Sequence, residues 1–218
     1  MKELLGEDDG PFLNPLIESR PSHILGFKLD PTLYIVASLG CNNGCEFCIT
    51  SHFFNCKNEK VLKTGKDLFN LIKEHRDKNY DRLRKAKVQT VYIFSENFLA
   101  DKVLLEEFSQ LVKIFDDDFP VSIGCFGSAA AVAQYEPEFL TEVGITNIWI
   151  GVESRLFNHN KLKGVNLHDL FDSLKRNGIV TIGSAIIGFP FHSPDNIRAD
   201  IDFLFSRSSS ALSSTNRG

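Results

Sequence analysis

Three cysteines lie close together in one short stretch of the sequence, at Cys41, Cys45 and Cys48. Their spacing is C-x3-C-x2-C, and the aromatic residue Phe47 stands directly before the third cysteine. Three thiolates on one loop can each ligate one iron of a [4Fe–4S] cluster, which leaves the fourth iron without a protein ligand. An open metal position of this kind is where a small molecule can bind and react. The spacing therefore predicts an iron–sulfur site with room for chemistry.

Zinc is the alternative metal for the same cysteines. Cys45 and Cys48 form a C-x-x-C half-site, and Cys56 offers a further thiolate a few residues later in the chain. A disulfide is less favoured, because nothing in the sequence is typical of a secreted protein. The spacing alone leaves both metals open, so the residues that follow the other predicted strands must separate them.

The cysteines directly follow an apolar, β-branched stretch, which predicts a strand. Four more apolar stretches follow, and segments with a helical period and capping residues separate them. Apolar strands that alternate with amphipathic helices are typical of an α/β fold, in which helices cover a parallel sheet. The predicted strands are 32–38, 88–94, 121–126, 147–151 and 179–187, and the predicted helices begin after Thr64, near Asp101, near Glu138, after Asn166 and after Ser193.

The 218 residues are expected to form one domain with a substantial core. Residues 1–31 contain four prolines without a sustained period, and they are predicted to be an N-terminal lead-in. Residues 32–205 carry the strands and helices of the core. Residues 206–218 are rich in serine and are predicted to be a disordered tail.

At the cysteine loop the sequence resembles the radical S-adenosylmethionine (radical SAM) superfamily. The signature of that superfamily is C-x3-C-x-aromatic-C after the first strand of a β/α barrel, and residues 41–48 match it. The resemblance implies a partial (β/α)6 barrel, of which about five β/α units are visible here. The sixth strand is therefore expected to be missing, and the chain is expected to be C-terminally truncated.

The resemblance also implies SAM-binding residues at the C-terminal ends of the strands, where β/α barrels carry their active sites. Glu96 stands where the superfamily often has a Gly-Gly-Glu motif that holds the SAM amino group, although the glycines are absent. Glu153 and Ser154 lie in a Gly-Val-Glu-Ser segment similar to one whose polar residues bind the SAM ribose. The alternatives are an ordinary acid before a helix for Glu96 and a salt bridge to Arg155 or a nearby lysine for Glu153.

The last of these segments reads Ile-Ile-Gly-Phe-Pro. It resembles the apolar strand end of the superfamily that packs beside the SAM adenine, and the resemblance implies this contact for Ile186 and Gly188. A glycine at this position lets the backbone approach a flat ring closely. Phe47, the aromatic residue of the cysteine signature, is placed with them as a cofactor-binding residue. An ordinary turn is the alternative for the Gly-Phe-Pro sequence. Zinc binding explains none of these later segments, so together they favour the cluster.

The segments SENFLAD, GVES and IIGFP look most like the branch of the superfamily that is often fused to a cobalamin-binding domain. Only 31 residues precede the first predicted strand, so cobalamin is not expected in this chain. The implied cofactors are a [4Fe–4S] cluster and SAM. Reduced flavodoxin or ferredoxin is the implied electron donor.

The implied reaction is reductive cleavage of SAM to methionine and a 5′-deoxyadenosyl radical, which abstracts hydrogen from a substrate. The substrate is unknown, and RNA, a peptide or a small metabolite are all open. Two other interpretations stay open beside this enzyme: a zinc-binding interaction module and an inactive truncated fragment.

The composition restricts the function further. A net charge of −4 argues against general nucleic-acid binding. Residues 57–87 carry eleven Lys and Arg against five Asp and Glu, which we interpret as a solvated helix and loop, with an RNA-facing or partner-facing patch as the alternative. The charged N-terminus is no signal peptide, and no apolar run approaches the roughly 20 residues of a membrane span. Five cysteines, three of them clustered, fit a reducing compartment, and the predicted location is the cytoplasm.

Overall fold

The structure is a computed structural model, and it describes residues 16–18, 23–24, 27–28, 32–86, 88–114, 121–156, 162 and 164–207. Residues 208–218, most of the predicted tail, lie outside the described residues. So do many residues of the predicted lead-in.

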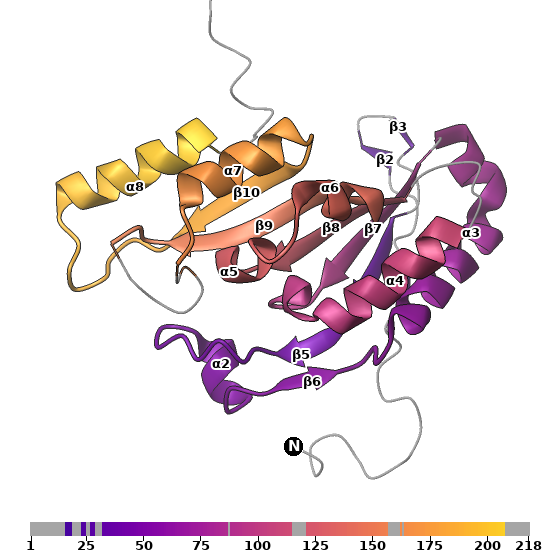
Figure 1. The fold of residues 1–218 in the computed structure, drawn as a ribbon, viewed down its shortest axis with the longest axis horizontal. Helices are drawn as coiled ribbons and strands as arrows, with labels where there is room; N and C mark the ends of the chain where they lie inside the picture. The colour runs from indigo at the N-terminus through magenta and orange to yellow at the C-terminus, as the bar shows by residue number, and fades with distance from the viewer. Residues whose placement is uncertain are drawn as a thin grey trace, which may run out of the picture.

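A six-stranded sheet forms the centre of the fold (Figure 1). Five of its strands are parallel, which confirms the predicted α/β class, and the sixth pairs antiparallel at one edge. Across the sheet the strands are β1 (Leu16–Glu18), β4 (Leu33–Val36), β7 (Gln89–Phe94), β8 (Val121–Gly127), β9 (Ile145–Glu153) and β10 (Val180–Ala185).

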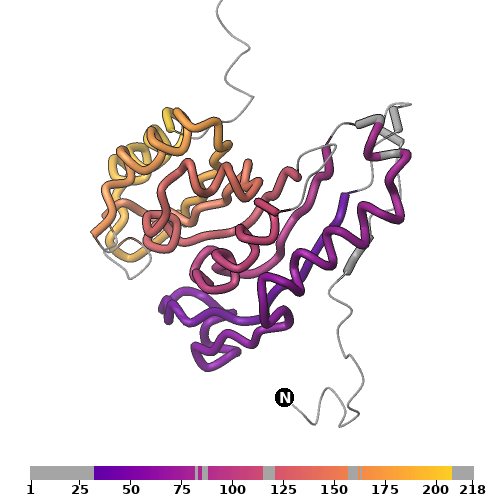
Figure 2. The backbone as a smooth tube through the Cα atoms, turned by 45° about the vertical axis from the view of Figure 1, so that its right-hand side comes forward, coloured from indigo at the N-terminus to yellow at the C-terminus, as the bar shows by residue number. Residues whose placement is uncertain are grey.

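The five parallel strands lie in the order in which they occur along the chain. Crossover connections between parallel strands are right-handed, so repeated steps in one direction put every connecting helix on the same face of the sheet. Figures 1 and 2 show the helices following one another along that side. This winding is that of a β/α barrel, and the sheet resembles part of such a barrel.

Each predicted helix is present. The predicted helices are α3 (Gly65–Ala86), α4 (Lys102–Ile114), the short α6 (Pro137–Glu142), α7 (Leu167–Arg176) and α8 (Pro194–Arg207). Two further short helices, η1 (Phe98–Ala100) and α5 (Ala129–Val132), follow β7 and β8. The capping predictions hold in detail. Thr64 Oγ1 accepts a hydrogen bond from the Asp67 N–H at 3.1 Å, while Asp67 accepts from the Thr64 N–H at 3.0 Å. Asn166 caps α7 by accepting from His168 and Asp169.

Side chains alternate between the two faces of the sheet. The face covered by helices carries the core, in which Leu33, Ile35, Val91, Ile93, Ile123, Cys125, Ile148 and Ile150 are buried. The opposite face carries mainly aromatic side chains that stay partly exposed: Tyr34, Tyr92, Phe94, Phe126 and Trp149. This inner face is the surface that a barrel encloses.

Two features of the first third of the chain were not predicted. Three short strands lie within the predicted lead-in: β1 joins the main sheet, and β2 (His23–Ile24) pairs with β3 (Phe27–Lys28). The first predicted strand, 32–38, is divided. After β4 the chain turns into β5 (Ser38–Gly40), which pairs antiparallel with β6 (Asn58–Lys60), and the cysteine loop and α2 (Ile49–Phe53) lie between these two strands.

At the other end of the core, α8 continues through Ser206 and ends at Arg207. These two residues were predicted to belong to the tail, and they are helical because the apolar face of α8, including Phe203, packs against the sheet. No helix in the described part of the chain is both long and apolar enough to cross a lipid bilayer.

Candidate functional site

The cysteine loop begins at the end of β5, and its third cysteine is the N-cap residue of α2. Cys41 and Cys45 are each 5% exposed, Cys48 is half-buried, and none of the three forms a disulfide. The loop is closed by a turn in which the Cys48 N–H donates to the Cys45 carbonyl oxygen at 3.0 Å. Three cysteine thiols on one loop, two of them shielded from water, are a donor set that fits an iron–sulfur cluster.

A single metal ion makes a different demand on its ligands. In the described residues, no three His, Cys, Asp or Glu side chains lie close enough together to hold one ion. A [4Fe–4S] cluster binds each thiolate at a different iron, so its ligands need not meet at one point. Cys56, the further ligand considered for zinc, is exposed, and its Sγ lies 3.7 Å from where a Cβ on Gly44 would be. It is therefore a neighbour of the loop.

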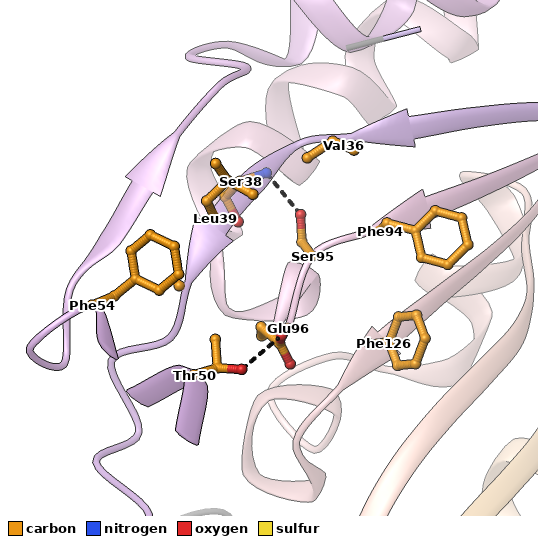
Figure 3. Close-up of a pocket in the computed structure, with 10 residues that line it drawn as sticks. Val36, Ser38, Leu39, Thr50, Phe54, Phe94, Ser95, Glu96 and Phe126 are labelled. Atoms are coloured by element: carbon orange, nitrogen blue, oxygen red, sulfur yellow. Dashed lines mark hydrogen bonds between the residues drawn. The ribbon is translucent and has the colours of Figure 1, made fainter. Parts of the chain in front are cut away.

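Two hydrogen bonds join the cysteine loop to the segment after β7. Ser95 Oγ accepts from the Ser38 N–H at 2.8 Å, just before the loop begins. Thr50 Oγ1, in the helix after Cys48, donates to Glu96 Oε1 at 3.3 Å. Figure 3 shows both bonds at the wall of a cavity of about 520 Å³. The predicted site residue Glu96 therefore lies beside the cysteine loop, although 46 positions separate it from Thr50.

The two predicted carboxylates line a second, smaller hollow of about 170 Å³. Glu96 reaches it from the segment after β7 and Glu153 from the end of β9, and the remaining polar side chains of its lining are Ser128 and Ser184. Glu153 is 7% exposed and has a φ of 62°, in the left-handed region that side chains other than glycine rarely adopt. A buried acid held in a strained backbone at the mouth of a parallel strand is typical of a functional site.

The turn between β10 and α8 approaches both parts of the site. The Ile186 N–H donates to the Glu153 carbonyl oxygen at 2.9 Å. The Phe189 ring packs edge-on against the Phe47 ring, with centroids 5.5 Å apart. Gly188 has a φ of 107°, and its N–H donates to His192 Nδ1 at 3.2 Å. The structure thus brings the Gly-Phe-Pro turn into contact with the cysteine signature.

Ser154 has a different environment from its neighbour Glu153. It is fully buried, and its Oγ accepts from the Leu156 N–H at 3.3 Å. It is absent from the linings of the hollows described above. Arg155, considered from the sequence as a partner for Glu153, directs its Nε to Asp200 Oδ1 at 3.1 Å. A contact between SAM and any of these residues stays a prediction.

Several lining residues were not singled out from the sequence. The two hollows are also lined by Thr50, Ser95, Phe126, Ser128, Trp149 and Ser184. Most of these residues lie at or just beyond the C-terminal end of a predicted strand, and this position could have marked them as candidates for the site. Their identity as small polar or aromatic residues was too ordinary to select them.

The basic segment 57–87 is partly neutralised by ion pairs. Lys60 pairs with Asp101 on η1's C-terminal side at 2.5 Å, and Lys73 and Lys78 pair within α3 with Asp77 and Glu74 at 2.6 and 2.8 Å. These pairs agree with a solvated helix. The alternative, an RNA-facing or partner-facing patch, remains a prediction.

No protein-family model matches the sequence, and no curated protein matches it either. Solved structures do resemble the fold. The radical SAM methyltransferase TsrM from Kitasatospora setae, with cobalamin and a [4Fe–4S] cluster bound, superimposes with a TM-score of 0.54 at 14% identity, over 79% of this chain and 34% of that one. The structure of TsrM with tryptophan substrate and the SAM analogue aza-SAM also has a TM-score of 0.54 at 14% identity. The superposition covers 80% of this chain and 34% of that one.

A third structure, the apo form of the cobalamin-dependent SAM radical enzyme OxsB, has a TM-score of 0.54 at 17% identity, over 81% of this chain and 26% of that one. The chain therefore spans about a third or less of the length of these enzymes. At such identities the likeness concerns the fold. The chain is an α/β protein whose five-stranded parallel sheet resembles the fold of cobalamin-dependent radical SAM enzymes.

Proposed function

We propose that this chain is the core of a radical SAM enzyme, with Cys41, Cys45 and Cys48 as ligands of a [4Fe–4S] cluster. SAM then binds between the cysteine loop and the ends of β7, β9 and β10. When bound, the cluster and SAM together supply a one-electron cleavage that yields a radical able to take hydrogen from a substrate. The electron comes from reduced flavodoxin or ferredoxin.

One observation carries this proposal most directly. The segments that resemble the superfamily lie far apart in the sequence, yet they meet at one end of the sheet. Phe47 contacts Phe189, Thr50 donates to Glu96, and Glu96 shares a hollow with Glu153. A zinc module would need only the cysteine loop, so the convergence of the other segments on that loop favours the enzyme.

The residues of the chain have distinct roles in this proposal. Glu153 accepts hydrogen bonds from the ribose hydroxyls, which gives its buried carboxylate partners in place of water. Glu96, oriented by Thr50, accepts from the SAM amino group. The Phe47 and Phe189 rings cover the loop and exclude water from the bound cofactor. Ile186 and Gly188 lie beside the adenine.

The experiment is anaerobic reconstitution with ferrous iron and sulfide. We expect a brown protein with about four irons per chain and an iron–sulfur charge-transfer band. Addition of SAM and dithionite should then release 5′-deoxyadenosine. Cys41→Ala, Cys45→Ala and Cys48→Ala should each lose the cluster, whereas Cys56→Ala, a cysteine beside the same loop, should keep it.

Two outcomes contradict the proposal. A colourless protein that holds one zinc per chain, and releases it in Cys56→Ala, would identify the zinc module. A protein that keeps its iron in Cys41→Ala but loses it in Cys56→Ala would show that the ligands have been assigned wrongly.

A further inference from the structure

A row of aromatic rings crosses the inner face of the sheet. Tyr34 on β4 stacks against Tyr92 on β7, with centroids 5.9 Å apart. The Phe94 ring lies 6.1 Å from that of Phe126 on β8, which in turn stacks on Trp149 of β9 at 5.6 Å and 26°. Four adjacent parallel strands therefore each contribute at least one ring to a continuous surface.

The rings of this aromatic row are more exposed to solvent than large apolar side chains usually are. Tyr92, Phe94 and Trp149 are 39, 44 and 42% exposed, and Ile182 of β10 beside them is 38% exposed. A contiguous exposed apolar surface of this kind commonly marks a binding site. The five strands that carry it also carry the candidate SAM site at their C-terminal ends.

Gly124 leaves the space on the sheet in which the Tyr92 ring lies. The two residues are paired in register on β8 and β7. A Cβ on Gly124 would lie 2.5 Å from Tyr92 Cε1 and 2.6 Å from Cδ1, so the tyrosine ring occupies the space that any other residue would fill. An alanine at this position would push the ring away from the sheet and into the space above it.

That space is a cavity of about 410 Å³, within the usual size range of small-molecule sites. Among the residues that the structure describes, its lining contains no Asp, Glu, Lys, Arg or His; the lining residues are Tyr34, Tyr92, Phe94, Cys125, Phe126, Asn147, Trp149 and Ile182. Phe126 also lines both hollows of the candidate SAM site, Phe94 lines the larger one and Trp149 the smaller. The cavity therefore adjoins the candidate SAM site, with which it shares these three side chains.

We propose that this cavity binds an uncharged, planar ring system of a small-molecule substrate, which stacks on the aromatic row beside Trp149 and faces the amide of Asn147. The substrate role rests on the proposed function. The chemistry of the ligand follows from the lining. A charged group would lose its hydration here without gaining an ionic partner, whereas a flat ring can stack on several protein rings at once.

Trp149 is the only tryptophan of the chain, so 5-fluorotryptophan labelling places a single fluorine in the cavity wall. Three probes of matched size separate the properties that matter: benzamide is planar and uncharged, benzoate is planar and anionic, and cyclohexanecarboxamide is uncharged and not planar. We expect a saturable ¹⁹F shift with benzamide. Cyclohexanecarboxamide should bind about tenfold more weakly, the upper range for loss of one aromatic stack. Benzoate should also bind more weakly, because its carboxylate would lose hydration without gaining an ionic partner.

Gly124→Ala should lower the affinity for benzamide, read from the ¹⁹F shift, by about tenfold or abolish binding, because the Tyr92 ring then occupies the cavity. Phe205→Ala removes a ring on α8 that is 78% exposed and far from the row in sequence and should leave the shift unchanged. Circular dichroism of both variants checks that the fold is kept. Trp149→Leu, read by saturation-transfer NMR of benzamide, gives an independent second measurement.

The outcomes separate this inference from the proposed function. Benzamide binding in a Cys41→Ala protein without a cluster supports the cavity whether or not the chain cleaves SAM. Equal binding of the three probes, or binding that Gly124→Ala does not change, overturns the inference. So does a chain that binds none of them and elutes as a dimer, because the aromatic row is then a protein interface.

Discussion

Asp200 on α8 accepts two hydrogen bonds from Arg155, the residue two positions after Glu153. Its Oδ1 lies 3.2 Å from the Arg155 backbone nitrogen and 3.1 Å from Arg155 Nε. The guanidinium also lies over the Phe203 ring, 5.1 Å from its centroid, and Asp200 is only 5% exposed. One buried carboxylate therefore fixes the backbone that leaves β9 and joins it to the last helix.

This relationship predicts that Asp200→Ala lowers the free energy of unfolding by about 2–3 kcal/mol, because the variant leaves the Arg155 backbone N–H and Nε without their acceptor. Urea denaturation measures the change. Asp202→Ala, on the same helix but exposed, is the matched control and should change stability by less than about 0.5 kcal/mol. Equal effects of the two substitutions would show that the bond contributes nothing specific.

Glu153 is predicted to contribute to SAM affinity. Glu153→Gln keeps the shape of the side chain but removes its charge, so the reconstituted variant should retain its cluster and bind SAM more weakly by about 1–3 kcal/mol. Calorimetric titration of SAM measures this. Glu138→Gln, an exposed acid at the start of α6, should bind SAM like the parent chain. Unchanged affinity in Glu153→Gln would remove Glu153 from the site.

The backbone of Glu153 supports a separate prediction about stability. At a φ of 62°, a residue with a Cβ is disfavoured by roughly 1–2 kcal/mol, and glycine is not. Glu153→Gly should therefore unfold with a free energy about 1 kcal/mol higher than that of Glu153→Ala, the reverse of the usual order within a strand. Denaturation of the two variants side by side decides this. A more stable alanine variant would contradict the left-handed conformation.

Cys125 supports a prediction about pH. Burial raises the pKa of its thiol to about 12, so at pH 8 it stays protonated and should resist iodoacetamide, whereas the exposed Cys56 should react. Because the thiol pKa is higher in the folded chain than the ordinary 9.0, its contribution to stability is complete below pH 9 and is lost as the pH rises toward 12. Tyr135, whose pKa burial also raises to about 12, acts in the same direction above pH 10.

Cys125→Ala isolates the contribution of the thiol. The variant should show a smaller loss of stability between pH 9 and pH 10 than the parent chain, in which the unfolded thiol ionises and the folded one does not. Denaturant midpoints at the two pH values provide the measurement. The same loss in both proteins would contradict a buried, neutral thiol.

The sequence was sufficient for the class of fold and for most elements. Alternation of apolar and polar residues, the caps at Thr64 and Asn166, and the strand–helix repeat are local properties, and each is present in the structure. The division of the first strand was not predictable in the same way. β5 leaves the sheet to pair with β6, and that pairing depends on a segment that begins beyond the cysteine loop. The β1 edge strand likewise depends on its partner β4 more than on its own short sequence.

The candidate site divides along the same line. The types and spacing of Cys41, Cys45 and Cys48 determined the predicted cluster ligands, because a metal site on one loop is specified by adjacent residues. Contacts between loops are different. That Phe47 meets Phe189, and that Glu96 and Glu153 line one hollow, follows from strand order and register, which bring the ends of β7, β9 and β10 together.

The aromatic row shows the physical reason most clearly. Tyr92, Phe126 and Trp149 each follow the alternation of their own strand, which assigns every residue to one of two faces but does not say which face is closed by helices or which rings will be neighbours. Right-handed crossovers determine which face the helices cover. The parallel register, which places Phe126 opposite Trp149, determines which rings are neighbours. The sequence alone therefore determined which cysteines are the predicted cluster ligands. The cavity over the aromatic row depends on how the strands pack against one another.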